Sequence, residues 1–353
     1  MLTFSEIIGQ NSIIEHLSNA LRTGNVSHAY ILCGDTGTGR KSIANAFAAA
    51  LQCEDLQWED GLPKPCGKCL SCLQAESGNQ PDIITVLHEK PASIGVDEIR
   101  RMRSDIQIRP YANPHKVYII PDAEKMTVQA QNAILKTLEE PPAYAVLILI
   151  ASGTETFLPT ILSRCVLLRT KAVSEGEIEK FLKNSESGAD SGNIHQNSEK
   201  ANDSDAGRIE RNIHLAARFA GGSPGRALQL MRDEEFIALR DRTIELLRGL
   251  KGTDIGSISA FVSELEAPRR EDFMNMVLMW YRDVLVYRET GAADNLIFGD
   301  DLQYIIEAAD ALSAEELGRI ADVIDEAARR LNSNAAADAV LETMLLRIRG
   351  AYR

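Results

Sequence analysis

The sequence contains no run of about 18 uninterrupted apolar residues, so it predicts neither a membrane-spanning helix nor a membrane partner. Its opening, MLTFSEIIGQ, lacks a basic segment followed by an apolar run, so no signal peptide is expected and a cytoplasmic location is predicted. A basic excess is also missing, because 38 Lys and Arg stand against 51 Asp and Glu and the net charge is −13. Proteins that bind DNA mainly through its phosphates usually carry a positive excess. Any contact with nucleic acid is therefore expected to be local or shared with partner subunits.

Cysteine is scarce, with six residues in the chain, and a cytosolic location argues against disulfides. Four cysteines have the spacing C-x12-C-x2-C-x2-C, which is typical of metal ligands: Cys53, Cys66, Cys69 and Cys72. Four thiolates form a closed tetrahedral site with no open position for water, so the pattern predicts structural Zn²⁺ in a knuckle at 53–72. The alternative is a surface loop that carries four reduced thiols.

The length predicts two or three domains. Over residues 1–170, short runs rich in Val, Ile and Leu alternate with helical patterns. The runs are 30–33, 82–86, 117–120, 146–151 and 166–168, and the helical patterns include 42–51, 96–106 and 127–138. Short apolar runs of this kind are typical of parallel strands buried on both sides. The first domain is therefore predicted to be α/β, with a parallel sheet and helices on both faces.

The rest of the chain is predicted to be helical. Residues 171–235 indicate a small helical domain, interrupted at 184–207 by a stretch rich in Asn, Ser, Asp, Glu and Gly. Such a composition cannot bury a core, so a disordered loop is predicted there. Residues 236–353 carry apolar side chains at intervals of three and four, which predicts a separate all-helical domain.

An altered phosphate-binding loop follows the first predicted strand. A functional loop reads G-x-x-x-x-G-K-[ST], in which backbone N–H groups surround the phosphates, the lysine neutralises them and the hydroxyl binds Mg²⁺. The corresponding residues here are Gly34, Gly37, Gly39, Arg40, Lys41 and Ser42. Arg40 stands where lysine belongs, and Lys41 replaces the hydroxyl. The Lys41-Ser42 pair stands one residue after the position of the Lys-Ser/Thr pair in a functional loop. One residue on a helix is a rotation of about 100°, so the pair would point in another direction. The loop either holds a phosphate through its amides or is a glycine-rich turn without nucleotide.

The second element of a hydrolytic site is incomplete as well. An apolar strand should end in two adjacent acids, but KVYIIPDAEKM offers Pro121 and Asp122, or Asp122 and Ala123. Neither register supplies a pair of carboxylates. Together with the altered loop, this predicts that the chain does not hydrolyse ATP by itself and that binding of ATP or ADP is doubtful.

Taken together, the motifs resemble those of a known family. They are SHAYILCG at 27–34, the cysteine knuckle, NAILKTLEEPP at 132–142, LPTILSRC at 158–165 and LNSNAAADAVLETMLLRIR at 331–349. In this order they resemble the bacterial DNA polymerase III clamp-loader subunits of the AAA+ superfamily. The resemblance implies an AAA+ ATPase-like domain at 1–170, a helical lid at 171–235 and a helical collar for oligomerisation at 236–353.

Within this family, gamma/tau subunits are motors that hydrolyse ATP, and delta-prime subunits largely do not. The altered loop and the missing acid pair favour the delta-prime branch. That branch implies a stator in a DNA-directed DNA polymerase holoenzyme, with gamma/tau and delta subunits as partners. Contact with the sliding clamp would be indirect, and primer-template DNA would be reached through the assembly. Two alternatives stay open: a motor in which Arg40 replaces the lysine, and a zinc-bearing adaptor with no role in clamp loading.

Several arginines have roles implied by the same resemblance. In Ser163-Arg164-Cys165, Arg164 corresponds to an arginine finger that contacts the γ-phosphate bound by a neighbouring motor subunit. Without the surrounding motif it would be interpreted as a surface arginine. Arg226 lies one residue beyond the position at which the family's motor subunits carry a nucleotide-sensing arginine. It therefore either senses nucleotide or caps its own helix. A basic cluster either forms a solvated helix face or contacts DNA phosphates: Arg100, Arg101, Arg103 and Arg109.

Overall fold

The structure is a computed structural model that describes residues 3–88, 92–189, 203–293, 296–332 and 336–352. The chain divides into two compact units. The N-terminal unit comprises Met1–His195 and Ala220–Ala227, and the C-terminal unit comprises Gln196–Phe219 and Leu228–Arg353. The predicted division into three domains thus stays a prediction, because residues 171–235 are shared between the two units.

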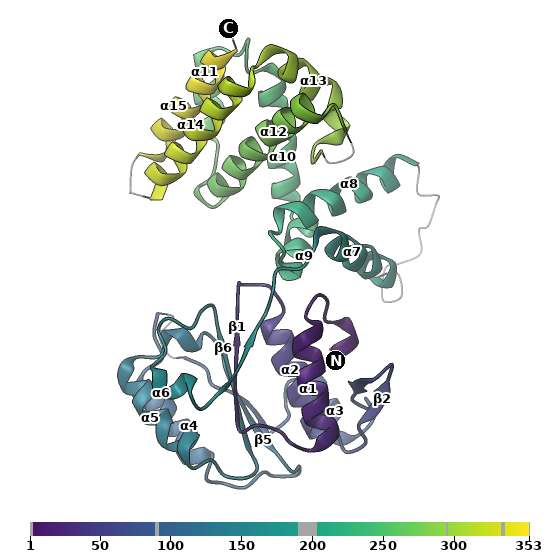
Figure 1. The fold of residues 1–353 in the computed structure, drawn as a ribbon, viewed down its shortest axis with the longest axis vertical. Coiled ribbons are helices and arrows are strands. Elements are labelled where there is room, and N and C mark those ends of the chain that lie inside the picture. The colour runs from purple at the N-terminus through teal and green to yellow at the C-terminus, as the bar shows by residue number, and fades with distance from the viewer. Residues whose placement is uncertain (1–2, 89–91, 190–202, 294–295, 333–335, 353) are drawn as a thin grey trace. The chain divides into compact units, whose positions relative to one another are not determined.

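A parallel five-stranded sheet forms the centre of the N-terminal unit, and Figure 1 labels three of its strands, β1, β5 and β6. The strand order is β4-β5-β6-β1-β7. The strands are β4 (Ile83–Thr85), β5 (Lys116–Ile120), β6 (Ala145–Ala151), β1 (Ala29–Cys33) and β7 (Val166–Arg169). Every residue of β1, β5 and β6 is buried. Each of the five predicted strands is confirmed, and the three that are covered on both sides, β1, β5 and β6, have the strongest apolar runs.

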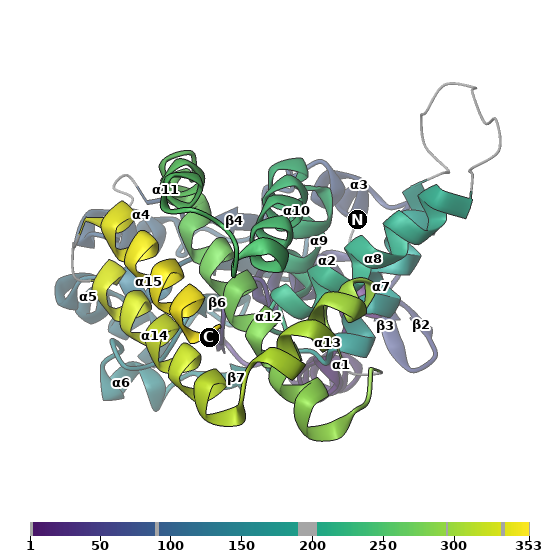
Figure 2. The ribbon, with the colours of Figure 1, turned by 90° about the horizontal axis from the view of Figure 1, so that it is seen from above.

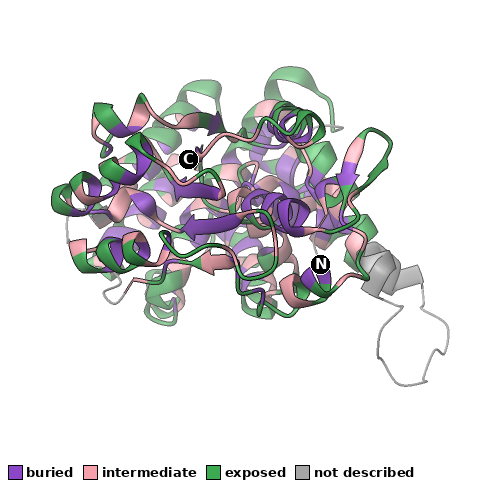
Figure 3. Cartoon of the chain, turned by 90° about the horizontal axis from the view of Figure 1, so that it is seen from below, coloured by how far each residue is buried: buried purple, intermediate pink, exposed green. Residues whose placement is uncertain are grey.

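Helices cover both faces of this sheet. One face packs Ile31, Ile120 and Leu147 against α4 (Val96–Asp105), α5 (Val128–Glu139) and α6 (Pro159–Leu162). The other face packs Leu32, Ile119 and Ile148 against α1 (Asn11–Thr23) and α2 (Arg40–Gln52). Successive strand residues point to opposite faces, so one apolar run supplies two cores. Figure 3 shows this buried material along the strands and the inner sides of the helices. The predicted α/β fold class is confirmed.

The described part of the chain after residue 170 is helical, as predicted. The helices are α7 (Glu175–Ala189), α8 (Asp203–Phe219), α9 (Pro224–Arg232), α10 (Glu234–Gly249), α11 (Ile255–Ser263), α12 (Arg270–Thr290), α13 (Leu302–Ala311), α14 (Ala314–Asn332) and α15 (Ala337–Ala351). Helices α7 and α8 both extend into the span 184–207 that was predicted as a loop. Composition indicates whether a segment can bury a core, but an established helix adds residues through backbone hydrogen bonds alone. Residues 190–202, the rest of that span, lie outside the described residues.

The C-terminal unit has its own aromatic core. Trp280 of α12 is buried and lies 5.8 Å from the ring of Phe298, and Phe219 lies 5.6 Å from Phe236. Helix α12 packs against α10, α13 and α14, and α15 packs against α11 and α14 (Figure 2). The buried carboxylate of Asp283 accepts hydrogen bonds from the backbone N–H groups of Ile297 and Phe298, at 2.6 and 2.8 Å. The unit is therefore a packed helical bundle with its own apolar interior. Among the described residues, no helix is long and apolar enough to cross a membrane.

Candidate functional site

The altered phosphate loop lies between β1 and α2, in the strand–loop–helix context that the sequence predicts. Gly34, Gly37 and Gly39 have φ angles of 144°, 81° and 93°, a region that side chains other than glycine rarely adopt. Gly39 is the N-cap of α2, so Arg40 and Lys41 begin the first helical turn. The loop thus turns through three glycines with positive φ, and the two residues after the last of them are both cations.

The start of α9 packs directly on this loop. The backbone N–H of Gly225 donates to the carbonyl of Gly37 at 3.1 Å. A Cβ atom added to Gly37 would lie 2.1 Å from the Oγ of Ser223. Thr38 is buried, donates to the carbonyl of Asp35 at 2.7 Å and shares a hydrogen bond with the hydroxyl of Thr170 at 2.7 Å. The hydroxyl of Thr38 is therefore occupied by internal contacts. The backbone N–H of Arg226 donates to Ser223 at 3.1 Å, which places Arg226 in the first turn of α9.

The acid that follows β5 is already neutralised. Asp122 caps the short 3-10 helix η2 (Ala123–Lys125) with φ 48°, and its carboxylate pairs with the Lys125 ammonium at 2.9 Å. Glu124, which the sequence analysis did not consider, accepts a hydrogen bond from Ser152 at 2.7 Å. The one acid directly after β5 is thus held by a neighbouring cation, and no second carboxylate stands next to it in the sequence.

The four predicted cysteines come together in one cluster. Their Sγ atoms all lie within 4.8 Å of one another, and the Sγ atoms of Cys66 and Cys72 are 3.9 Å apart. Four sulfurs about 2.3 Å from a central Zn²⁺ would be about 3.8 Å from each other. Cys53 follows α2, Cys69 is the N-cap of α3 (Leu70–Glu76) and Cys72 lies within α3. The donor set and its spacing fit a tetrahedral four-thiolate site.

Backbone N–H groups point at the sulfurs of this cluster. The N–H groups of Cys66, Cys69 and Cys72 donate to the Sγ atoms of Cys53, Cys66 and Cys69, at 3.2, 3.4 and 3.4 Å. The N–H groups of Lys68 and Cys69 lower the pKa of the Cys66 thiol to about 6. Burial raises the pKa of Cys53 and of Cys72 above that of an ordinary thiol. Four thiols that share such a small space ionise together only with a cation among them, so the cluster suits a structural metal.

The segment that carries the cysteines is packed on the N-terminal unit. It contains a hairpin of β2 (Gln57–Glu59) and β3 (Leu62–Lys64), which no pattern in the sequence indicates. Arg22 of α1 donates to the carbonyl of Gly61 at 2.9 Å, and its guanidinium lies 4.6 Å from the ring centre of Trp58. At the other end, Asn113 donates to Ser71 of α3 at 2.8 Å. Protein contacts therefore hold the segment independently of any metal.

Arg164 lies at the surface between α6 and β7, with its side chain 35% exposed. Its Nη1 donates to the carbonyl of Thr160 at 3.0 Å and to Ser163 at 3.3 Å. Its Nη2 pairs with a carboxylate oxygen of Glu139, the last residue of α5, at 3.0 Å. Burial raises the pKa of the neighbouring Cys165 to about 12, so that thiol stays protonated. Arg164 is thus a partly exposed, oriented cation, and Cys165 packs inward beside the core.

The basic cluster lies on and after α4. Arg100 pairs with Asp97 at 3.3 Å, and both side chains are more than 60% exposed. Arg101 and Arg109 are exposed and Arg103 is half-buried. An i,i+3 ion pair on an exposed helix face is common without any ligand, so the solvated face accounts for Arg100. Contact of this cluster with DNA phosphates stays the untested alternative.

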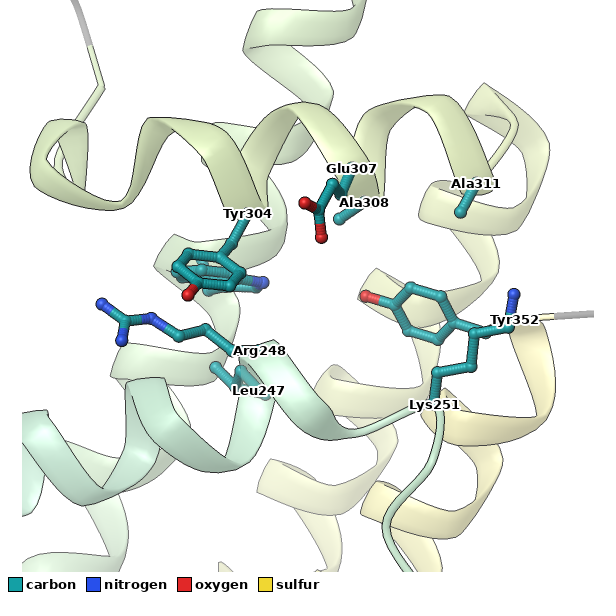
Figure 4. A pocket seen from close by; sticks show the side chains of 9 residues that line it. Leu247, Arg248, Lys251, Tyr304, Glu307, Ala308, Ala311 and Tyr352 are labelled. Carbon is teal, nitrogen blue, oxygen red and sulfur yellow. The ribbon is translucent and has the colours of Figure 1, made fainter.

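A cavity of about 220 Å³ lies in the C-terminal unit, apart from every residue that the sequence predicted as functional. It is lined by the end of α10, by α12 and α13, and by Tyr352. Figure 4 shows the Glu307 carboxylate pointing into the space between the rings of Tyr304 and Tyr352. The guanidinium of Arg248 lies 4.5 Å from the ring centre of Tyr304 and pairs with Asp301. No sequence motif marks this cavity, because its lining comes from separate helices.

Known proteins similar to this chain include subunits of DNA polymerase III. A family model described as DNA polymerase III, delta subunit, matches residues 9–174. The tau/gamma subunit of DNA polymerase III from Haemophilus influenzae is 35% identical over 180 residues, or 51% of this chain. The matched part is 25% of the length of that relative, so the chain spans about a quarter of it. A DNA polymerase III gamma subunit-related protein from Thermotoga maritima, a solved structure, is 19% identical with a TM-score of 0.41, covering 96% of this chain and 99% of that one.

A second kind of relative matches along nearly its whole length. The delta-prime subunit of DNA polymerase III from Bacillus subtilis is 28% identical over 347 residues, which cover 96% of this chain and 95% of the relative. The match includes both units of the structure and the C-terminal helices. The predicted resemblance to clamp-loader subunits, and within them to delta-prime, is therefore confirmed.

Proposed function

We propose that this chain is a delta-prime subunit of a bacterial DNA polymerase III clamp loader and that it acts in the cytoplasm. The observation that carries the proposal is the similarity to a delta-prime subunit along 96% of this chain and 95% of the relative. Similarity to tau/gamma over half of the chain agrees with a shared ATPase-like domain. In this role the chain assembles with gamma/tau and delta subunits. It reaches the sliding clamp and primer-template DNA through that assembly.

The site chemistry supports a subunit that does not hydrolyse ATP. The residue in place of the Mg²⁺-binding hydroxyl is Lys41, whose cation would repel the metal. The single acid after β5, Asp122, is paired with Lys125. The start of α9 packs on Gly37, in the loop that would surround a phosphate. In this proposal the chain is the stator, and the cysteine cluster holds one structural Zn²⁺.

Arg164 is the residue that we propose to act in catalysis, on the neighbouring subunit. A guanidinium is permanently charged and planar, so it stabilises the charge that develops on a transferred phosphoryl group. Its partial exposure leaves it accessible to a partner surface. The chain would thus take part in ATP hydrolysis without binding the nucleotide that is cleaved.

Reconstitution tests the proposed function. Addition of the chain to gamma/tau and delta subunits is expected to give an assembly that loads the clamp on primed DNA, measured by fluorescence of a labelled clamp. Omission of the chain is expected to abolish loading. Loading that proceeds equally well without it would favour the adaptor.

The motor alternative is favoured by the higher sequence identity to a tau/gamma subunit. It predicts that the purified chain hydrolyses ATP by itself and that Arg40→Ala abolishes this hydrolysis.

A further inference from the structure

The Arg164 side chain is fixed at both of its terminal nitrogens within its own chain. Nη1 donates to Thr160 and Ser163, and Nη2 pairs with Glu139 at 3.0 Å. The first two partners belong to the turn that carries Arg164, whereas Glu139 lies on a different helix, α5. Glu139 is therefore the contact that fixes the guanidinium relative to the rest of the N-terminal unit.

The position of Glu139 is unfavourable for the helix that carries it. The C-terminal end of a helix has a partial negative charge, so acids are usually avoided there. Helix α5 nevertheless ends in Glu139, with Glu140 as its C-cap and two prolines after it. The Glu139 side chain is half exposed, and its pairing with the Arg164 guanidinium offsets part of this unfavourable charge.

The pair leaves donors of Arg164 available. A guanidinium has five N–H groups, and the three contacts above use at most three of them. Among the described residues, none accepts a hydrogen bond from Nε, and Nη2 has a second N–H. An arginine held in one orientation with unused donors loses less conformational freedom when it binds an oxyanion.

We infer that Glu139 is a positioning residue for Arg164, because its carboxylate holds the guanidinium so that the free N–H groups face a phosphate of the neighbouring subunit. This inference rests on the proposed function, in which Arg164 acts on that phosphate. Glu139 itself touches neither nucleotide nor reacting atoms. An exposed ion pair contributes little to folding, so its effect is expected in the rate of hydrolysis and not in stability.

The test uses the reconstituted assembly with Glu139→Ala, Glu139→Gln and Glu140→Ala. Glu139→Ala is expected to lower kcat for ATP hydrolysis at the site beside this chain by about 10-fold to 100-fold, because misplacement by about 1 Å has a cost of this size. KM for ATP is expected to stay unchanged, since the nucleotide is bound by the neighbour. Glu139→Gln keeps the size of the side chain but removes its charge, so a kcat between those of Glu139→Ala and the wild type is expected, because the contact with Nη2 is an ion pair. Glu140→Ala is the matched control and is expected to behave like the wild type, since Glu140 forms no ion pair among the described residues.

The outcomes separate this inference from the proposed function. If Arg164→Ala slows hydrolysis but Glu139→Ala leaves kcat at or above the wild-type value, the positioning role is wrong and the finger stands. If Arg164→Ala itself has no effect, the finger and the positioning role both fail. Thermal unfolding of each variant and size-exclusion chromatography of each assembly verify folding and assembly. A drop in kcat with an intact complex and an unchanged Tm is the expected result.

Discussion

Arg164→Ala is expected to slow ATP hydrolysis at the site beside this chain by about 10³-fold or more, which is the usual contribution of an arginine finger. The guanidinium reaches the surface of the N-terminal unit with only part of its donors used. Its removal leaves the developing charge on the γ-phosphate without that cation. Phosphate release in a single turnover of the reconstituted assembly measures the effect, since the phase from this one site should disappear.

Arg164→Lys is the informative companion variant. Lysine keeps the charge but lacks the planar fork, so partial activity is expected, between that of wild type and that of Arg164→Ala. The side chain is partly exposed and its ion pair contributes little to stability, so both variants should fold and assemble like the wild type. Wild-type phosphate release by Arg164→Ala in an intact complex would contradict the proposed role.

Cys66→Ser is expected to reduce bound zinc from about one ion per chain to almost none. Zinc in such sites is held by deprotonated thiolates, and one hydroxyl in place of a thiolate removes a strong ligand. The Tm is expected to fall by about 10 °C, as for a loss of a few kcal/mol in a unit of this size. Complete unfolding is not expected, because Arg22, Trp58 and Ser71 also hold the segment.

Elemental analysis of the purified chain measures its zinc content, and thermal melts with and without a chelator measure the change in Tm. Cys165→Ala is the matched control. Cys165 lies against the core and outside the cluster, so its variant should keep the zinc of the wild type. A wild-type chain that carries no zinc and melts at the same temperature with the chelator would show that the four thiols have no structural metal.

The three central strands, β1, β5 and β6, were predictable because of their burial. Residues such as Ile31 and Leu32 face opposite cores, so β1 is an uninterrupted apolar run that stands out from helical and half-exposed patterns. The hairpin of β2 and β3 has no such signal. Each of its strands has only three residues, those of β2 are all exposed, and the place of the hairpin is fixed by Arg22, a distant residue. Contacts between distant segments cannot be derived from local periodicity.

The part of the candidate site that depends only on short sequence spacing was predictable. The two C-x2-C steps keep Cys66, Cys69 and Cys72 close together, and the fold brings Cys53 to the same place. The Asp122–Lys125 pair is three residues apart and could have been foreseen from its spacing. The Glu139–Arg164 pair and the contact between Gly37 and Gly225 could not, because they join elements whose relative placement depends on the whole fold.

Magnesium-dependent ATP turnover by the chain alone, by gamma/tau alone and by their mixture distinguishes a stator that supplies Arg164 from a motor. We expect no turnover by the chain, a basal rate for gamma/tau, and a higher rate in the mixture that Arg164→Ala abolishes. Sustained turnover by the chain alone would contradict the stator role, and so would stimulation that is indifferent to Arg164.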